Sequence, residues 1–350
     1  SPVPSTLHPT MVVISVQSRP GKIQLIEPSR FLGKELTGDG VVNLCLVNPV
    51  DGVSFSVNEN ADPDVRTDHL AAIPRLHPPP GSAQALLFKK SVTLPYAAGR
   101  CCLGTWQGVY LIDLREDKNA KEPVNIVVTT RSSAKRAAFS VNATARDATQ
   151  LEPEICKRLP VEGGAVFIHE MHTSASLSVG SGNLEPIMNR VVPEKWHHEF
   201  FQHTLEGVDD MTGHLKCSLL GCSATVPVHD QKPMIPVRLN EHRYAGGFGV
   251  GHDRRVLLDH LPGSQPAYDF SVDGPCELSG ELVKGGALCN LVVGRGQGGF
   301  LVGSQQAVEK FQAPDEAIMA RSIDWPLEAQ SVGQQLWWRG GPATFRVSPL

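Results

Sequence analysis

Short apolar runs separated by glycine and proline are the main pattern along the chain. The 350 residues include 33 glycines and 27 prolines. The segments SVTLPY from Ser91 and SATVPV from Ser223 alternate apolar and polar residues, as strands with one buried face do. The pattern therefore predicts many short strands and few helices.

Three stretches of the chain share one order of elements. GGAVFIHEMHTSASLSVGS from Gly163 and GGALCNLVVGRGQGGFLVGS from Gly285 each give a glycine pair, a buried strand, a turn and a second strand ending in Val-Gly-Ser. GDGVVNLCLVNPVDGVSFSVNEN from Gly38 repeats this rhythm more weakly. Such self-similarity indicates repeated units.

Further segments extend the repeat. Three alternating segments could open the units: MVVISVQ, RAAFSVNA and AYDFSVDG, from Met11, Arg136 and Ala267. PATFRV from Pro342 is expected to match SVTLPY and SATVPV. A period of about 120 residues has the size of a domain. We therefore predict three domains, at residues 11–130, 131–260 and 265–350; the alternative is a β-rich protein of two domains without repeats.

The densest polar stretch is HTLEGVDDMTGHLKCSLLG, residues 203–221. Asp209 and Asp210 precede an apolar run with helical spacing, so an aspartate here could cap a helix. His214 lies four residues after Asp210 and would share its helix face. His203 and Glu206 would approach from the preceding loop.

A second polar segment could face the same cavity. His172 follows a buried strand, and the small residues Thr173, Ser174 and Ser176 after it offer hydroxyl and amide donors to a phosphate. Histidines beside carboxylates suit acid-base chemistry or a divalent metal, for which Asp209 and Asp210 are the candidate ligands. The alternative is a capped helix whose histidines only satisfy buried hydrogen bonds.

Four segments together resemble the YjbQ-like family, whose bacterial members are called secondary thiamine-phosphate synthases. These segments are VNENADPDVRTDHLAAIPRL, LGTWQGVYLIDLR, FIHEMHTSASLSV and HTLEGVDDMTGHLKCSLLGCSATVPV. The resemblance implies an α+β unit that associates as a homotrimer. For this chain it implies three repeated two-layer α/β-sandwich domains that form an intramolecular pseudo-trimer.

The three copies keep different parts of the family motifs. Glu59, Trp106 and Gln107 survive only in the first copy, while the histidine and aspartate motifs survive only in the second. The third copy has VGRGQGGF at the turn and EAIMARSIDWPLEAQSVGQQLWW in its expected helix region, without histidine. We therefore expect at most one pocket, in copy two or between copies one and two, with Glu59, Trp106 and Gln107 binding ligand beside Thr173, Ser174 and Ser176.

Two functions fit this partial conservation of motifs. The first is a subunit of a larger protein assembly with reduced or lost catalysis, in which Trp337 or Trp338 contacts a partner. The second, implied by the resemblance, is an enzyme that joins a pyrimidine diphosphate to a thiazole phosphate, with magnesium as a helper. Its expected catalytic residues are His172, His203, Glu206, Asp209, Asp210 and His214.

Composition limits the partners and the cellular compartment that the chain is expected to have. The formal net charge is −4 and no basic run stands out, so nucleic-acid binding is not indicated. No apolar run is long enough to cross a bilayer. Eight cysteines without a Cys-x-x-Cys pair suit an intracellular, reducing compartment, cytoplasm or an organelle matrix such as that of mitochondria. SPVPSTLHPT at the start could be the stub left by an import signal.

Overall fold

The computed structural model describes most of the chain, and the statements below concern that part. The described residues are 11–32, 36–47, 51–77, 81–180, 182–244, 251–263, 266–282, 288–312, 322–326 and 335–350. The expected import stub at residues 1–10 lies outside them. No described helix is long and apolar enough to cross a membrane.

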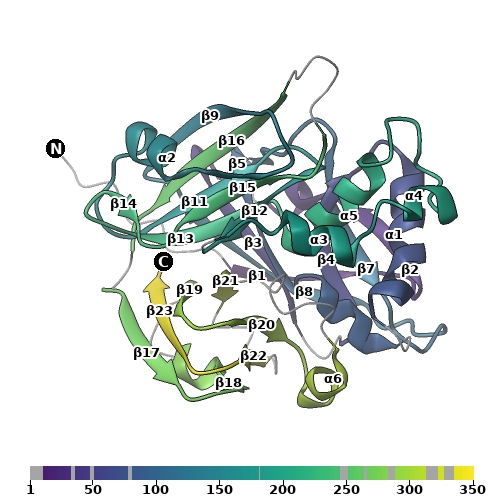
Figure 1. Cartoon of the computed structure of the whole chain (residues 1–350). Coiled ribbons are helices and arrows are strands. Elements are labelled where there is room, and N and C mark those ends of the chain that lie inside the picture. The colour runs from purple at the N-terminus through teal and green to yellow at the C-terminus, as the bar shows by residue number, and fades with distance from the viewer. Residues whose placement is uncertain are drawn as a thin grey trace.

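Strands of the described residues form six antiparallel sheets, which follow one another along the chain as three pairs (Figure 1). We call the part that holds the first pair unit 1. Its strands are β1 (Met11–Val16), β2 (Lys22–Ile26), β3 (Asp39–Val47), β4 (Val53–Glu59), β5 (Ser91–Ala97), β6 (Arg100–Cys101), β7 (Gln107–Asp113) and β8 (Val124–Ser132). Its helices are η1 (Pro28–Phe31), α1 (Pro63–Leu76) and η2 (Ser82–Leu87).

Unit 2 and unit 3 hold the other two pairs of sheets. The strands of unit 2 are β9 (Lys135–Ala143), β10 (Ala148–Gln150), β11 (Ala165–Glu170), β12 (Ala175–Val179), β13 (Ser223–His229), β14 (Lys232–Pro233), β15 (Val237–Glu241) and β16 (His252–Leu261). Its helices are α2 (Glu152–Arg158), α3 (Glu185–Val191), α4 (Trp196–Glu199) and α5 (Asp210–Leu220). Unit 3 has β17 (Tyr268–Val272), β18 (Cys276–Glu277), η4 (Ser279–Leu282), β19 (Leu288–Arg295), β20 (Gly298–Val302), α6 (Gln305–Lys310), β21 (Ser322–Pro326), β22 (Leu336–Gly340) and β23 (Ala343–Pro349).

The strand order is the same in each unit. The larger sheets read β1-β8-β3-β5-β6, β9-β16-β11-β13-β14 and β17-β23-β19-β21. The smaller sheets read β2-β7-β4, β10-β15-β12 and β18-β22-β20. The chain is therefore an α+β protein in which one sheet topology occurs three times.

Two predictions about the third unit are wrong. PATFRV forms β23, which occupies the place of β8 and β16, whereas the strand that corresponds to β5 and β13 is β21. That strand, SIDWP, lies inside the expected helix region. Alternation of apolar and polar residues is the same in every half-buried strand, so it does not distinguish one strand of a sheet from another. Residues 313–321 and 327–334 of the expected helix region lie outside the described residues.

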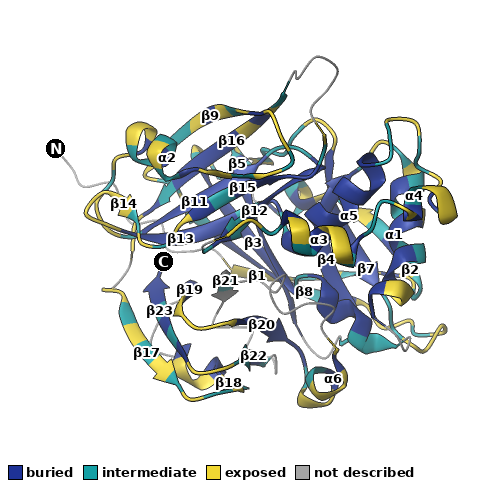
Figure 2. Ribbon diagram, in the orientation of Figure 1, coloured by how far each residue is buried: buried dark blue, intermediate teal, exposed yellow. Residues whose placement is uncertain are grey.

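Apolar side chains also pack across the boundaries between units. One core cluster combines Ile73 of α1, Leu215 of α5 and Phe311 after α6, so it draws on all three units. The thiols of Cys217 and Cys222 from unit 2 lie in the core cluster of unit 1. Figure 2 shows this burial along the strands and helices where the units meet.

The tandem tryptophans lie on strand β22. Trp338 is buried in the core of unit 3, and its indole N–H donates to Gly341 O at 2.9 Å. Trp337 is half-buried, packs against the cluster shared by the units and donates to Gly303 O at 3.0 Å. The described contacts of this pair are therefore those of a core and a unit boundary.

Strands β5, β13 and β21 contact one another pairwise, although each belongs to a different unit. They carry the related sequences SVTLP, SATVP and SIDWP, in which Asp324 corresponds to Thr93 and Thr225. The Asp324 carboxylate accepts the Thr93 hydroxyl at 2.6 Å and the Thr225 hydroxyl at 2.9 Å. Asn290 Nδ2 donates to its other oxygen at 2.9 Å, so one carboxylate binds groups from all three units.

We expect Asp324→Ala to lower the free energy of unfolding by about 2 kcal/mol, because two hydroxyls and an amide lose a charged acceptor. Urea unfolding followed by circular dichroism measures this change. Asp253→Ala, at an exposed position of β16, is the matched control and should leave stability within about 0.5 kcal/mol. Equal stability of the Asp324 and Asp253 variants would contradict the assigned role.

Candidate functional site

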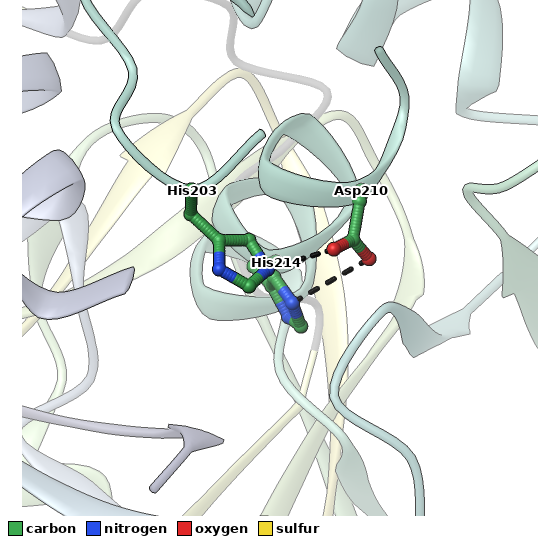
Figure 3. A group of neighbouring side chains, drawn as sticks. All are labelled: His203, Asp210 and His214. Atoms are coloured by element: carbon green, nitrogen blue, oxygen red, sulfur yellow. Dashed lines mark hydrogen bonds and ion pairs between the residues drawn. The ribbon is translucent and has the colours of Figure 1, made fainter. Parts of the chain in front are cut away.

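The candidate site lies where α1 of unit 1 meets α5 of unit 2. His203, in the loop before α5, places its imidazole between two carboxylates. Its Nδ1 lies 2.6 Å from Asp62 of unit 1, and its Nε2 lies 2.7 Å from Asp210 of unit 2. Figure 3 shows the imidazole rings of His203 and His214 beside the carboxylate of Asp210. One histidine therefore joins acidic groups from two units.

Helix α1 fixes this loop through its own first turns. Asp62 is the N-cap and accepts the backbone N–H of Asp64 at 2.8 Å, with Pro63 as the first helical residue. Two turns further, the buried Asp68 carboxylate accepts the backbone N–H groups of Gln202 and His203, each at 2.9 Å. The helix of unit 1 therefore holds both the backbone and the ring of His203.

Helix α5 presents the two remaining groups on one face. His214 lies four residues after Asp210, and its Nδ1 lies 3.0 Å from the Thr173 carbonyl, to which it can only donate. That bond leaves Nε2 as an acceptor, 3.6 Å from Asp210 Oδ1. The Thr173 carbonyl thus fixes the His214 tautomer that carries its hydrogen on Nδ1, and the lone pair of Nε2 faces the site.

Asp209, one of the two aspartates that could cap α5, does not cap it. It is the N-cap residue, but its backbone is in the helical region and its side chain makes no capping bond. Its carboxylate instead accepts the backbone N–H of Tyr244 at 2.5 Å. A distant segment of unit 2 therefore takes the oxygen that a cap would have used.

The pKa values of His203 and His214 are shifted in opposite directions. The hydrogen bond to Asp210, together with that to Asp62, raises the pKa of His203 to about 9, although burial opposes this. Burial would raise the pKa of Asp210, but the bond from His203 and the nearby His214 and Arg243 lower it. Burial lowers the pKa of His214. At neutral pH the site holds an imidazolium, a carboxylate and a neutral imidazole.

The three unit 1 residues expected to bind ligand differ in their contacts. Glu59 is buried, burial raises its pKa, and its Oε2 lies 3.5 Å from the Thr173 hydroxyl. Gln107 joins the units instead: Nε2 donates to Glu170 O at 2.9 Å and His172 O at 2.8 Å. Trp106 is 55% exposed.

The remaining unit 2 candidates surround the cluster at different depths. His172 Nδ1 accepts the Ser174 backbone N–H at 3.2 Å, and burial lowers the His172 pKa to about 3. Ser176 lies in another buried network, where its hydroxyl contacts His242 Nε2 at 2.9 Å. Glu206 is exposed and pairs with Arg243 at 3.0 Å. His203, Asp210, His214, Thr173 and Glu59 thus come together, whereas Ser176 and Glu206 do not join them.

Three residues of the site were not predicted: Asp62, Asp68 and Arg243. The Arg243 guanidinium lies 2.9 Å from Asp210 Oδ1, and its Nε is buried without an acceptor among the described residues. The Asp-Pro pair that starts α1 was a local signal for a helix cap. Nothing local indicated that this cap contacts a histidine 141 positions later.

The cluster could also hold a metal ion. Ligand atoms of His203, Asp210 and His214 lie within 4.8 Å of one another. Two imidazole nitrogens and one carboxylate oxygen are donors that suit zinc better than magnesium. Both nitrogens of His203 already contact carboxylates, however, so binding would require loss of its proton and of one of these bonds.

The fold and the site together define an α+β protein with repeated units and a polar cluster at a unit boundary. The family model for UPF0047 protein YjbQ-like matches the chain twice, at residues 29–130 and 138–237. Because these matches cover more than half of the sequence, the chain belongs to the YjbQ-like UPF0047 family. Repeats one and two are therefore copies of one domain.

Curated relatives match one copy. UPF0047 protein YjbQ of Salmonella typhimurium is 34% identical over 100 residues, 25% of this chain and 70% of the relative. The Escherichia coli O157:H7 protein of the same name is 33% identical over 105 residues, which cover 27% of this chain and 70% of the relative. UPF0047 protein MJ1081 of Methanocaldococcus jannaschii is 32% identical over 83 residues, 21% of this chain and 55% of the relative.

Solved structures of the family also align with part of the chain. A YjbQ/UPF0047 protein from Clostridium acetobutylicum is 23% identical, covers 34% of this chain and 98% of its own, and has a TM-score of 0.28. A YbjQ-like protein of unknown function from Sulfolobus solfataricus P2 is 16% identical and has a TM-score of 0.29. The alignment covers 37% of this chain and 96% of that protein.

The raised pKa of His203 predicts a pH-dependent contribution to stability. Its folded-state pKa of about 9 lies above the unfolded value of 6.5, so the contribution is full below about pH 6.5 and disappears as pH rises through 9. The difference in unfolding free energy between the wild type and His203→Gln should therefore shrink over this range. Urea unfolding at several pH values measures it; a constant difference would contradict the assignment.

Proposed function

We propose that this chain is a one-site member of its family, an intramolecular pseudo-trimer whose units 1 and 2 jointly form a proton-transfer site for a phosphorylated small molecule. The observation that carries the proposal is the bridge of His203 between Asp62 and Asp210, which come from different units. In a trimer of separate chains the same bridge would join two subunits. Fusion would keep it at one boundary only.

The pseudo-trimer is supported by strand order and by contacts. The same topology occurs three times, and the corresponding strands β5, β13 and β21 contact one another pairwise, as strands around a threefold axis do. Residues 265–350 contain no histidine, so unit 3 cannot supply the histidines of an equivalent site. Unit 1 has no histidine in η2, SAQALL, which precedes β5 as α5 precedes β13, so unit 2 alone supplies the histidines of a site.

The protonation states suit acid-base chemistry. Both ring N–H groups of His203 face carboxylates, which stabilise the imidazolium, so His203 can donate a proton once a substrate oxygen replaces Asp62 or Asp210 as its partner. His214 can accept a proton at Nε2, because its Nδ1 hydrogen is held by the Thr173 carbonyl. A donor and an acceptor lie side by side, with ring centroids 5.3 Å apart. This arrangement could protonate the leaving phosphate oxygen, whereas the thiazole nitrogen that attacks carries no hydrogen and needs no base.

Charge balance favours a phosphate that arrives with a divalent cation. Asp62, Asp209 and Asp210 surround the site, while Arg243 and the His203 imidazolium are the nearby cations. A bare phosphate would meet a surplus of carboxylates, whereas a magnesium-bound diphosphate would not. Magnesium therefore stays a proposed helper, and Asp209 and Asp210 its proposed ligands, which requires Arg243 to move aside.

The reaction to test is the one that the family resemblance implies, the joining of a pyrimidine diphosphate to a thiazole phosphate with release of pyrophosphate. We expect His203→Asn to lower kcat/KM by about 10²- to 10⁴-fold, the range for loss of a general acid or base. Asp62→Asn should lower it less and shift the pH profile to lower pH, because the imidazolium loses one carboxylate. Product formation with magnesium measures both.

The control for these variants is His198→Asn, at an exposed histidine of α4, which should keep full activity. Circular dichroism and unfolding curves check that each variant is folded. If the unmutated protein does not turn over the two precursors, this reaction is excluded for the chain.

The second candidate is a subunit of a larger protein assembly. It is favoured by unit 3, where residues 294–297, at the end of β19 and in the turn after it, read Gly-Arg-Gly-Gln in place of His172 to Ser174 of unit 2. Loss of polar motifs from a unit that keeps its strands indicates that the fold is retained for another reason than chemistry.

Gentle purification from the cells that make the protein tests this candidate. We expect it to elute in a stoichiometric complex with other proteins, because the fused block would offer its outer faces to them. Size-exclusion chromatography with mass spectrometry gives the composition. Elution of the chain alone, at its own mass of 37.8 kDa, would argue against the structural role.

A further inference from the structure

A cavity of about 510 Å³ lies between unit 2 and unit 3, on the far side of unit 2 from the acid-base site. Its lining includes Gly163 before β11, Val228 on β13, and Ala267 and Ser348 of unit 3. A volume of this size is typical of pockets that bind small molecules or large side chains. The register of the sheets shows why the space exists.

The boundary between units 1 and 2 has an arginine in the corresponding place. Arg136 on β9 pairs with Asp259 on β16. Its guanidinium contacts the Asp259 carboxylate at 2.9 and 2.7 Å and Asp39 of unit 1 at 2.8 Å. It also donates to Gly40 O at 3.1 Å. A forked ion pair therefore fills the first boundary.

Unit 3 carries smaller residues at these positions. Tyr268 pairs with Val347, so Ala267 lies opposite Ser348, as Arg136 lies opposite Asp259. Arginine is thus replaced by alanine and aspartate by serine. The space that the guanidinium occupies at one boundary is left open at the other.

The residues of unit 2 that line the cavity are also smaller than the corresponding residues of unit 1. Ala165 pairs with Pro227 as Val41 pairs with Pro95 of unit 1. Counting back two residues, Gly163 takes the place of Asp39. One residue after the prolines, Val228 takes the place of Tyr96. Both changes enlarge the cavity.

The lining includes a buried hydroxyl and one carboxylate. Ser348 is 3% exposed, and its hydroxyl has no partner among the described residues. Arg346, on the same face of β23, is neutralised by Asp269 in a bidentate pair at 2.5 and 2.6 Å. Glu162 at the lining has no ion pair in the described part of the chain, which leaves one carboxylate for a cation.

We propose that this cavity binds an alkylguanidinium group, which takes the place that Arg136 occupies at the first boundary. The Ser348 hydroxyl would accept from it inside the cavity, and the Glu162 carboxylate would balance its charge. The methylene chain would lie against Pro227 and Pro262, beside Met234, whose sulfur contacts Arg346 Nη1 at 2.8 Å. The group could belong to a free small molecule or to an arginine side chain of a polypeptide.

Isothermal titration of the full chain with agmatine and with a blocked Gly-Arg-Gly peptide tests the proposal. Saturable binding of either supports it, and the comparison of the two identifies the source: a tighter peptide indicates a polypeptide, and binding of agmatine alone a small molecule. The matching lysine peptide should bind at least tenfold more weakly, since an ammonium cannot fork between two acceptors.

Two substitutions localise the binding. Ala267→Arg should abolish it, because the new side chain fills the cavity from within, whereas Ala145→Arg, on an exposed loop, should leave it unchanged. Ser348→Asp restores the carboxylate of the first boundary and should tighten binding roughly tenfold, equivalent to about 1.4 kcal/mol. This second variant keeps the test valid if Ala267→Arg fails to fold.

The proposal is overturned if neither ligand binds the wild type at millimolar concentration, or if Ser348→Asp leaves the affinity unchanged. Persistent binding to a folded Ala267→Arg protein would overturn it as well. Equal binding of the arginine and lysine peptides, or binding of propionate in their place, would show that the cavity does not recognise a guanidinium.

Discussion

The amide of Gln107 is the contact on which the geometry of the candidate site depends. From the start of β7 in unit 1 it donates to two carbonyls of unit 2, those of Glu170 and His172, and its oxygen lies 3.0 Å from His169 Nε2. These bonds fix the turn after β11 against unit 1. The same turn carries the Thr173 carbonyl that orients His214, so a link between units sets a tautomer inside one of them.

The chemistry at this boundary is therefore a property of the pair of units. Asp68 holds the backbone of the loop, Asp62 holds one side of the His203 ring, and Asp210 holds the other. Asp210 of unit 2 makes the largest contribution to the raised pKa of His203, and Asp62 of unit 1 raises that pKa further. The apolar cluster shared by α1 and α5 holds the two helices together and so stabilises this arrangement.

Local patterns predicted the local parts of this structure well. The spacing of Asp210, His214 and the following leucines indicated the helix that the structure has at Asp210–Leu220. Of the three predicted copies, the family model matches the first two, at residues 29–130 and 138–237. The contact of Asp62 with His203 was missed because sequence periodicity carries no information across 141 residues. The sequence left open a helix cap by Asp209 or Asp210; Asp209 does not form it, because the backbone N–H of the distant Tyr244 binds its carboxylate. The place of PATFRV in its sheet was wrong because alternation fixes a strand but not its neighbours.

Asp324 lies at a position where a single chain can carry a different residue in each of its three units. In a ring of three identical chains, any residue at the shared centre appears three times, and three carboxylates there would repel one another strongly in a partly dry environment. A single polypeptide can place one acid and two alcohols at the same spot, so that a lone negative charge is solvated by hydroxyl groups of its own neighbours. Covalent linkage thus makes available a centre that no symmetric assembly of equal subunits can build.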